Sequence, residues 1–216
     1  MTYSLTPAIQ DYLEVIHDLS KHDSKVRITD IARKLNVAKS SVTEAIELLH
    51  AKNLVQKERY GPITLTRNGE REAAKLKYKH LLISKFLRDV LNVTADTAEK
   101  DACLIEHVVS VETMLALIQL LESKNYLDND IDIEEVKILL STNSLSNLAP
   151  GTKGTIKRVE ATGELRRRLM EMGVTSGDDI QVKRVAPMGD PIEITVKGYN
   201  LTLRKNEAAA ILIEIN

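Results

Sequence analysis

The spacing of apolar residues changes at Pro150-Gly151, and this change constrains the fold more than any other feature of the chain. Before it, apolar residues recur every three or four positions, as Ile9, Leu13 and Ile16 do, which is typical of a helix with one buried face. After it, short apolar or alternating runs are separated by glycine or proline, as strands are. The sequence therefore predicts a mainly helical region followed by a small β domain.

Five short strands crowded into the last part of the chain favour a small barrel. A short helix between the first and second strands is expected to end at Gly173. Residues 141–150 are rich in Ser and Asn and are predicted to be a linker. The expected strands cover residues 153–159, 180–185, 192–196, 201–204 and 211–215.

The helical region begins with helix, helix, tight turn, helix and β-hairpin, and the last four are the elements of a winged helix-turn-helix. Pro7 is expected in the first turn of the first helix, because proline is favoured at that position. Thr29 is expected to cap a short second helix, and a third helix follows over 39–53. Two strands around a Gly-Pro turn form the expected hairpin, or wing.

Two longer helices are expected over 67–91 and 96–122, and residues 133–140 fit one more. The helix over 96–122 carries apolar residues on more than one side. One side can pack within the subunit, and the other then indicates contact with a second copy of the chain. A central helix in a larger monomer is the alternative.

The winged helix-turn-helix predicts DNA binding, because the N-terminal end of its recognition helix meets base edges and phosphates. Residues 27–67 hold eight Lys or Arg against four Asp or Glu, whereas residues 96–135 hold two against eleven. The basic segment favours DNA over a helical hairpin with a merely solvated face, and a dimer is expected because one unit contacts few phosphates. The candidate DNA-contacting residues are Arg27, Lys39, Ser40, Ser41, Thr43, Lys57, Arg59 and Tyr60.

A set of potential metal ligands is spread over three of the expected helices. The i, i+3, i+4 spacing of Cys103, Glu106 and His107 places a thiol, a carboxylate and an imidazole on one helix face. Oxygen and nitrogen ligands suit Mn²⁺ and Fe²⁺, whereas the sulfur shifts the preference toward softer ions. Taken alone, the Glu106-His107 pair is also consistent with a structural role, and Cys103 is also consistent with a small buried apolar residue. The six candidates are Asp11, Glu14, His80, Cys103, Glu106 and His107.

Several classes of protein are disfavoured by the sequence. A single cysteine excludes a disulfide framework, and no apolar stretch of 18 or more residues predicts a membrane span. No secretory signal, HExxH motif or nucleophile elbow occurs, so we expect a cytoplasmic protein that is not an enzyme. A metallohydrolase and an adaptor that binds a transporter are remote alternatives. No membrane contact and no small-molecule substrate are expected.

Five stretches in order carry a resemblance: DYLEVIHDL (11–19), DIARKLNVAKSSVTEAI (30–46), GPITLTRNGE (61–70), KHLL (79–82) and DACLIEHVVS (101–110). With them, the first 140 residues resemble the diphtheria-toxin-repressor (DtxR/MntR) family of metal-dependent transcriptional repressors. LMEMGV (169–174) and RVAPMGDPI (184–192) resemble the FeoA-like SH3-type barrel. The resemblance implies a winged-helix domain over 1–72, a helical dimerisation and metal-binding domain over 73–140, the linker, and the barrel over 151–216.

The resemblance implies a hybrid set of metal ligands. Asp11 and Glu14 match the manganese-responsive branch, Cys103 matches the iron-responsive branch, and the other three candidates are common to the family. Ser84 and Glu99 stand where the iron branch has a glutamate and a histidine of an ancillary site, and Glu99 can still ligate. Both Fe²⁺ and Mn²⁺ remain open, with one or two ions per subunit.

The implied function is that of a homodimeric repressor that uses the metal to bind palindromic operator DNA of metal-uptake and homeostasis genes. Glu44 stands where the best-known iron regulator has a base-reading glutamine, so that regulator's operator sequence does not transfer. The barrel is expected to contact protein or to stabilise the active dimer. The alternative is a metal-independent winged-helix regulator whose Glu106-His107 pair is structural.

Overall fold

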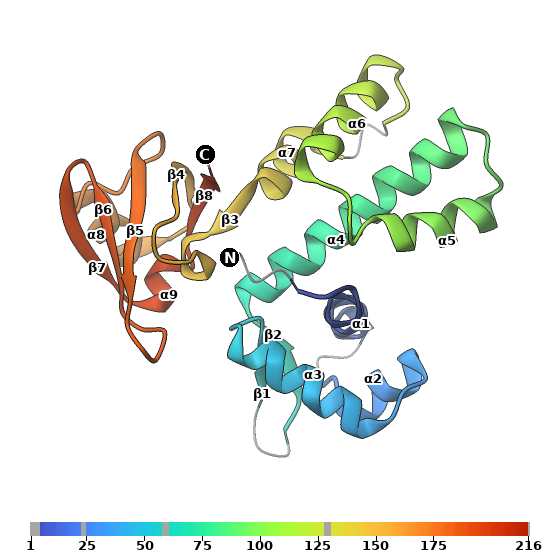
Figure 1. Ribbon diagram of the computed structural model, residues 1–216, viewed down its shortest axis with the longest axis horizontal. Coiled ribbons are helices and arrows are strands. Elements are labelled where there is room, and N and C mark those ends of the chain that lie inside the picture. The colour runs from blue at the N-terminus through green and yellow to red at the C-terminus, as the bar shows by residue number, and fades with distance from the viewer. Residues whose placement is uncertain (1–4, 23–24, 58–60, 128–130, 216) are drawn as a thin grey trace. The chain divides into compact units, whose positions relative to one another are not determined.

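The computed structural model describes residues 5–22, 25–57, 61–127 and 131–215 (Figure 1). The chain forms two compact units, residues 4–140 and residues 141–216. Among the described residues, none of the helices combines the length and the hydropathy that a membrane span needs.

The first unit begins with three helices and a two-stranded antiparallel hairpin, in the order that the sequence predicts. Their apolar faces meet in one core, in which Leu13, Ile16 and Leu49 are completely buried. The bounds are α1 Pro7–His22, α2 Ile28–Leu35, α3 Lys39–Ala51, β1 Val55–Lys57 and β2 Ile63–Leu65.

The expected cap of the second helix is wrong by two residues. Helix α2 begins at Ile28, so Thr29 already lies in its first turn. Arg27 occupies the cap position, and its backbone N–H donates to the Asp30 carboxylate at 3.2 Å. The Asp30 carboxylate takes the place of a capping hydroxyl here, because it accepts from an N–H that would otherwise be unpaired.

The long helix α4 (Arg67–Lys85) follows and continues as a single π-helical stretch over Phe86–Val90. It starts at the N-cap Thr66, whose hydroxyl accepts from the Gly69 N–H at 3.0 Å. It packs against the first core and a second one, whose buried residues include Leu82 and Met114. It thus connects the winged-helix elements to the helices that follow.

The prediction of one helix over 96–122 is wrong. The structure has α5 (Ala95–Ile105) and α6 (Val111–Ser123), joined by residues 106–110, called here the α5–α6 turn. Ser110 starts the new helix, since its hydroxyl accepts from the Thr113 N–H at 3.1 Å. The apolar periodicity runs through this turn and hides it. Helix α7 (Ile133–Ser141) closes the region.

The second unit is a six-stranded antiparallel sheet with strand order β3-β8-β4-β5-β6-β7. Its core includes the fully buried Ile156, Leu169 and Ile213, and short helices α8 (Gly163–Glu171) and α9 (Lys205–Ala208) accompany the sheet. The strands are β3 Thr142–Ser144, β4 Lys153–Val159, β5 Asp179–Val185, β6 Ile192–Val196, β7 Tyr199–Leu203 and β8 Ile211–Ile215. The predicted mainly helical fold with a C-terminal SH3-like β domain is confirmed.

Strand β3 was not expected, because it lies within the stretch predicted to be a linker, 141–150. It pairs with β8 over Thr142–Ser144, and a 3-10 turn over Leu145–Asn147 follows. Thr142 and Ser144 are buried, but the sequence Thr-Asn-Ser has no apolar alternation to mark a strand. The stretch is therefore ordered structure of the second unit, and the boundary at residue 72, which lies inside α4, stays a prediction.

Candidate metal centre

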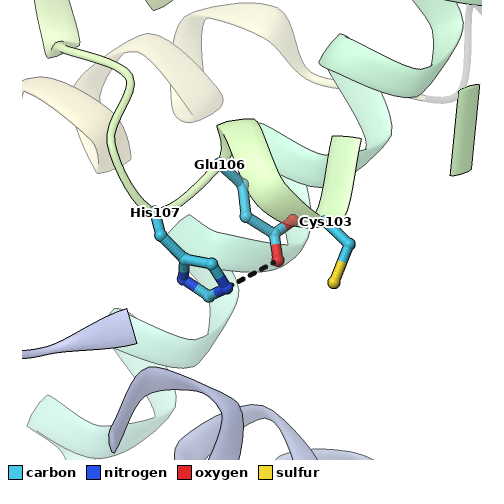
Figure 2. Close-up of side chains that lie close together, drawn as sticks. All are labelled: Cys103, Glu106 and His107. Carbon is cyan, nitrogen blue, oxygen red and sulfur yellow. Dashed lines mark ion pairs between the residues drawn. The ribbon is translucent and has the colours of Figure 1, made fainter. Parts of the chain in front are cut away.

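Potential ligands converge from α1 and from the α5–α6 turn. The Nε2 atom of His107 lies 3.1 Å from an Asp11 carboxylate oxygen and 3.6 Å from a Glu106 carboxylate oxygen. Figure 2 shows the Glu106 carboxylate between the imidazole of His107 and the thiol of Cys103. The early end of α5 places Glu106 at the C-cap of that helix and His107 just beyond it. The two side chains can thus turn toward α1.

Two overlapping groups of three residues meet at this point. In each group, one potential ligand atom per residue lies within 4.8 Å of the other two. The first group is Cys103, Glu106 and His107, and the second is Asp11, Glu14 and the same His107. Sharing of one imidazole means that the two groups form one centre between α1 and the turn.

His80 of α4 extends this centre toward α5. Its Nδ1 lies 2.8 Å from a Glu106 oxygen, and its Nε2 lies 2.8 Å from a Glu99 oxygen. The Ser84 hydroxyl donates to the other Glu99 oxygen at 3.2 Å. All seven predicted metal-site residues are therefore brought together, although their role as ligands stays a prediction.

The centre is acidic and partly buried, which shifts its protonation. Burial, then the charges of Glu106 and Asp11, raise the pKa of Glu14 to about 7. Burial raises the pKa of Glu106 to about 7 against the opposing effect of His80, and only 1% of its side chain is exposed. Such carboxyls hold protons near neutral pH, and a cation could replace those protons.

The remaining groups follow the same logic. Burial, then the charge of Glu106, raise the pKa of the Cys103 thiol, although the residue is exposed on one side. Burial alone would lower the pKa of His80, but the hydrogen bond to Glu99 and the charge of Glu106 outweigh it and raise that pKa. The hydrogen bond from His80 lowers the pKa of Glu99. An imidazolium at position 80 can then donate from both ring nitrogens.

The donor set fits a divalent transition metal. Carboxylate oxygens and imidazole nitrogens suit Fe²⁺ and Mn²⁺, and the one thiol adds affinity for softer ions. Because the site is partly buried and carries an excess of negative charge, it would attract a cation more strongly than the same groups would in water.

Sequence reasoning missed two residues of this centre. The Gln10 side-chain oxygen accepts from His107 Nδ1 at 2.7 Å. The Lys79 ammonium donates to the backbone carbonyls of Glu106 and Val109, both at 3.2 Å, and so ties the turn to α4. A neutral amide and a lysine are not the usual ligands of Fe²⁺ or Mn²⁺, so only their position beside Asp11 and His80 could have drawn attention to them.

Five of the candidate DNA-contacting residues are exposed on the winged-helix elements. Lys39, Ser40 and Ser41 are exposed in the first turn of α3, and exposed Thr43 donates its hydroxyl to the Lys39 carbonyl at 2.9 Å. Arg27 is exposed before α2. Lys57 of β1 forms an ion pair with Glu47 of α3, while Arg59 and Tyr60 lie outside the described residues.

Comparison with known proteins gives three successive matches to family models. Residues 4–63 match the N-terminal DNA binding domain of iron dependent repressors, and residues 66–128 match their metal binding and dimerisation domain. Residues 143–215 match the FeoA domain.

Individual proteins are similar as well. An uncharacterized HTH-type transcriptional regulator of Methanocaldococcus jannaschii is 37% identical over 111 residues, which cover 51% of this chain and 89% of that protein. The HTH-type transcriptional regulator MntR of Bacillus subtilis is 34% identical over 105 residues, 49% of this chain and 73% of the relative. The solved structure of the manganese regulator SloR aligns with 98% of this chain and all of that one (100%), at 26% identity and a TM-score of 0.48.

Proposed function

Because the chain belongs to the iron-dependent repressor (DtxR/MntR) family of metal-dependent transcriptional regulators, we propose that it is a homodimeric repressor activated by Fe²⁺ or Mn²⁺. It binds palindromic operator DNA and controls genes of metal uptake and homeostasis. It acts in the cytoplasm, where that DNA is. The observation that carries the proposal is the meeting of Asp11, in the matched DNA-binding part, with Glu106 and His107, in the matched metal-binding part.

The proposed switch depends on α1. Asp11 and Glu14 would hold the ion from α1, and Glu106 and His107 would hold it from the α5–α6 turn. A bound divalent cation would balance the negative charge of these carboxylates. Leu13 of α1 packs in the same core as α3, which is the proposed recognition helix. A restraint on α1 therefore also restrains α3. The size of the switch is limited by the difference in metal affinity between the restrained and unrestrained arrangements.

The mixed donor set leaves the choice between the two metals to experiment. Asp11 and Glu14 supply hard oxygen ligands, and Cys103 supplies the only sulfur. We propose one or two ions per subunit. A second ion would take ligands from His80 and Glu99, which already contact each other, and His80 also contacts Glu106.

The dimer is proposed from exposed apolar side chains around the α5–α6 turn. Leu104 is 72% exposed and Val108 is 77% exposed, and clusters of exposed apolar side chains mark interaction surfaces. Two copies joined here would carry two recognition helices. A palindromic operator needs these helices at successive major grooves, about 34 Å apart.

Contact with DNA would use the exposed face of α3 and the wing. Lys39 can bind phosphate or guanine, and Ser40 and Ser41 can bond to phosphates or bases. Lys57 would exchange its ion pair with Glu47 for a phosphate. Exposed ion pairs contribute about 1 kcal/mol or less, so this exchange is cheap.

The direct test is selection of genomic DNA fragments by the purified protein under anaerobic conditions. Parallel selections contain Fe²⁺, Mn²⁺ or a chelator. We expect palindromic promoter fragments with one metal and none with the chelator. Equal enrichment in all three would refute metal control and favour the metal-independent regulator.

Variants test the assigned centre. Asp11→Ala and His107→Ala should lose metal-dependent enrichment. Asp96→Ala, which removes an exposed carboxylate in the first turn of α5, is the matched control and should behave as wild type. Wild-type behaviour of both site variants would show that the ligands are assigned wrongly.

A further inference from the structure

Gln10 connects the first turn of α1 to His107, a residue 97 positions away. We infer that Gln10 is a positioning residue: its amide oxygen accepts the Nδ1 proton of His107 and so directs Nε2 at the metal centre. The inference deepens the proposed function and rests on it, since it concerns the same site.

The first step is the orientation of the Gln10 amide. Its nitrogen donates to the backbone carbonyl of Leu5 at 3.2 Å. A carbonyl oxygen can only accept, so the amide nitrogen must face Leu5. The amide oxygen must therefore face His107, and the two ends of the amide cannot be exchanged without loss of a hydrogen bond.

The second step is the proton on Nδ1 of His107. The amide oxygen can only accept, so the 2.7 Å contact requires a proton on Nδ1. With Nδ1 held by this hydrogen bond, Nε2 is the ring nitrogen left for a cation, which would displace any proton on it. This Nε2 lies 3.1 Å from Asp11 and 3.6 Å from Glu106, among the candidate ligands. The amide thus selects the nitrogen that can bind a cation.

The third step is the cost of losing the amide oxygen. Only 7% of the His107 side chain is exposed, so an Nδ1–H without an acceptor would be buried and unpaired. The ring would then rotate or give up its Nδ1 proton, and either change removes the constraint that presents Nε2 to the centre. Loss of a group that orients a ligating histidine typically lowers metal affinity about 10- to 100-fold.

The first experiment is nitrogen-15 NMR of the histidine rings in the metal-free, full-length protein at pH 8. Wild type should show a hydrogen-bonded proton on Nδ1 of His107. Gln10→Met, which removes the acceptor but keeps the length, should lose this hydrogen-bonded proton. His50 is an internal reference, because its Nδ1 faces the Val55 carbonyl at 3.1 Å and should keep its proton in both proteins.

The second experiment is Mn²⁺ binding by calorimetry. Gln10→Met should bind about 10- to 100-fold more weakly than wild type. Gln10→Glu keeps an acceptor oxygen for Nδ1 and should restore most of the affinity, which a merely structural role would not predict. Gln56→Met, at an exposed position in β1, is the matched control.

The outcomes separate the two proposals. Absence of a proton on Nδ1 of His107 in wild type, or an unchanged Nδ1 proton and unchanged affinity in Gln10→Met, would overturn the role of Gln10. Equal weakening in Gln10→Met and Gln10→Glu would also overturn it. Absence of Mn²⁺ binding in wild type would instead refute the proposed function, whatever the state of Nδ1.

Discussion

Metal binding should release protons, and the number released should identify Cys103 as a ligand. The perturbation is Cys103→Ala, compared with wild type at pH 6 and pH 8. A ligand must be deprotonated to bind, so every proton held in the metal-free centre is expelled on binding. The buried acids and the thiol hold these protons over different pH ranges, which makes their contributions separable.

The magnitudes follow from the pKa values. A carboxyl with a pKa of about 7, as at Glu14 and Glu106, holds about 0.9 proton at pH 6 and about 0.1 at pH 8. The Cys103 thiol, with its pKa raised, stays largely protonated at both. Wild type should therefore release roughly three protons from these groups at pH 6 and roughly one at pH 8. Cys103→Ala should release roughly two at pH 6 and almost none at pH 8.

The assay is anaerobic calorimetry of Mn²⁺ binding in buffers with different ionisation enthalpies. A proton displaced from His80 at pH 6 adds equally to both proteins and cancels in their difference. Lys100→Ala, at an exposed position in α5, is the control and should match wild type. A difference near zero at pH 8 would show that the thiol does not ligate. Equal release at both pH values within each protein would refute the protonated carboxyls.

Three further predictions concern stability, the turn and assembly. With a chelator present, thermal unfolding should show less stability at pH 8 than at pH 5. The folded protein holds protons on Glu14 and Glu106 up to about pH 7, whereas the unfolded chain holds them only up to about pH 4.5, so the stability present at low pH is lost as the pH rises. A stability that does not change with pH would contradict this. Lys79→Met should increase amide hydrogen exchange across the α5–α6 turn and weaken Mn²⁺ binding, with Lys79→Arg closer to wild type; unchanged exchange would show that the ammonium does not hold the turn. Leu104→Glu should shift the protein toward monomer in sedimentation, because a charge would be buried in the proposed interface, while a dimer as stable as wild type would place that interface elsewhere.

Much of the fold was accessible from local pattern. Helix α1 and strand β4 begin where Pro7 and the spacing at 153–159 predict, because helical and strand periodicities are short-range properties of the chain. Candidate ligands were accessible too, since Cys103, Glu106 and His107 are near neighbours in sequence. Asp11 was grouped with them by residue type and by the expected helices, and the resemblance to a family then matched it to the manganese-responsive branch.

What only the tertiary structure decided is how these residues meet. The end of α5 at Ile105 turns His107 toward α1, and a uniform apolar periodicity does not signal that break. The bond from His107 to Gln10 joins residues 97 positions apart, so no local pattern encodes it. Burial by packed helices, not residue type, raises the pKa of Glu106 to about 7. Sequence determines which donors the chain offers, whereas long-range packing determines their orientation and charge.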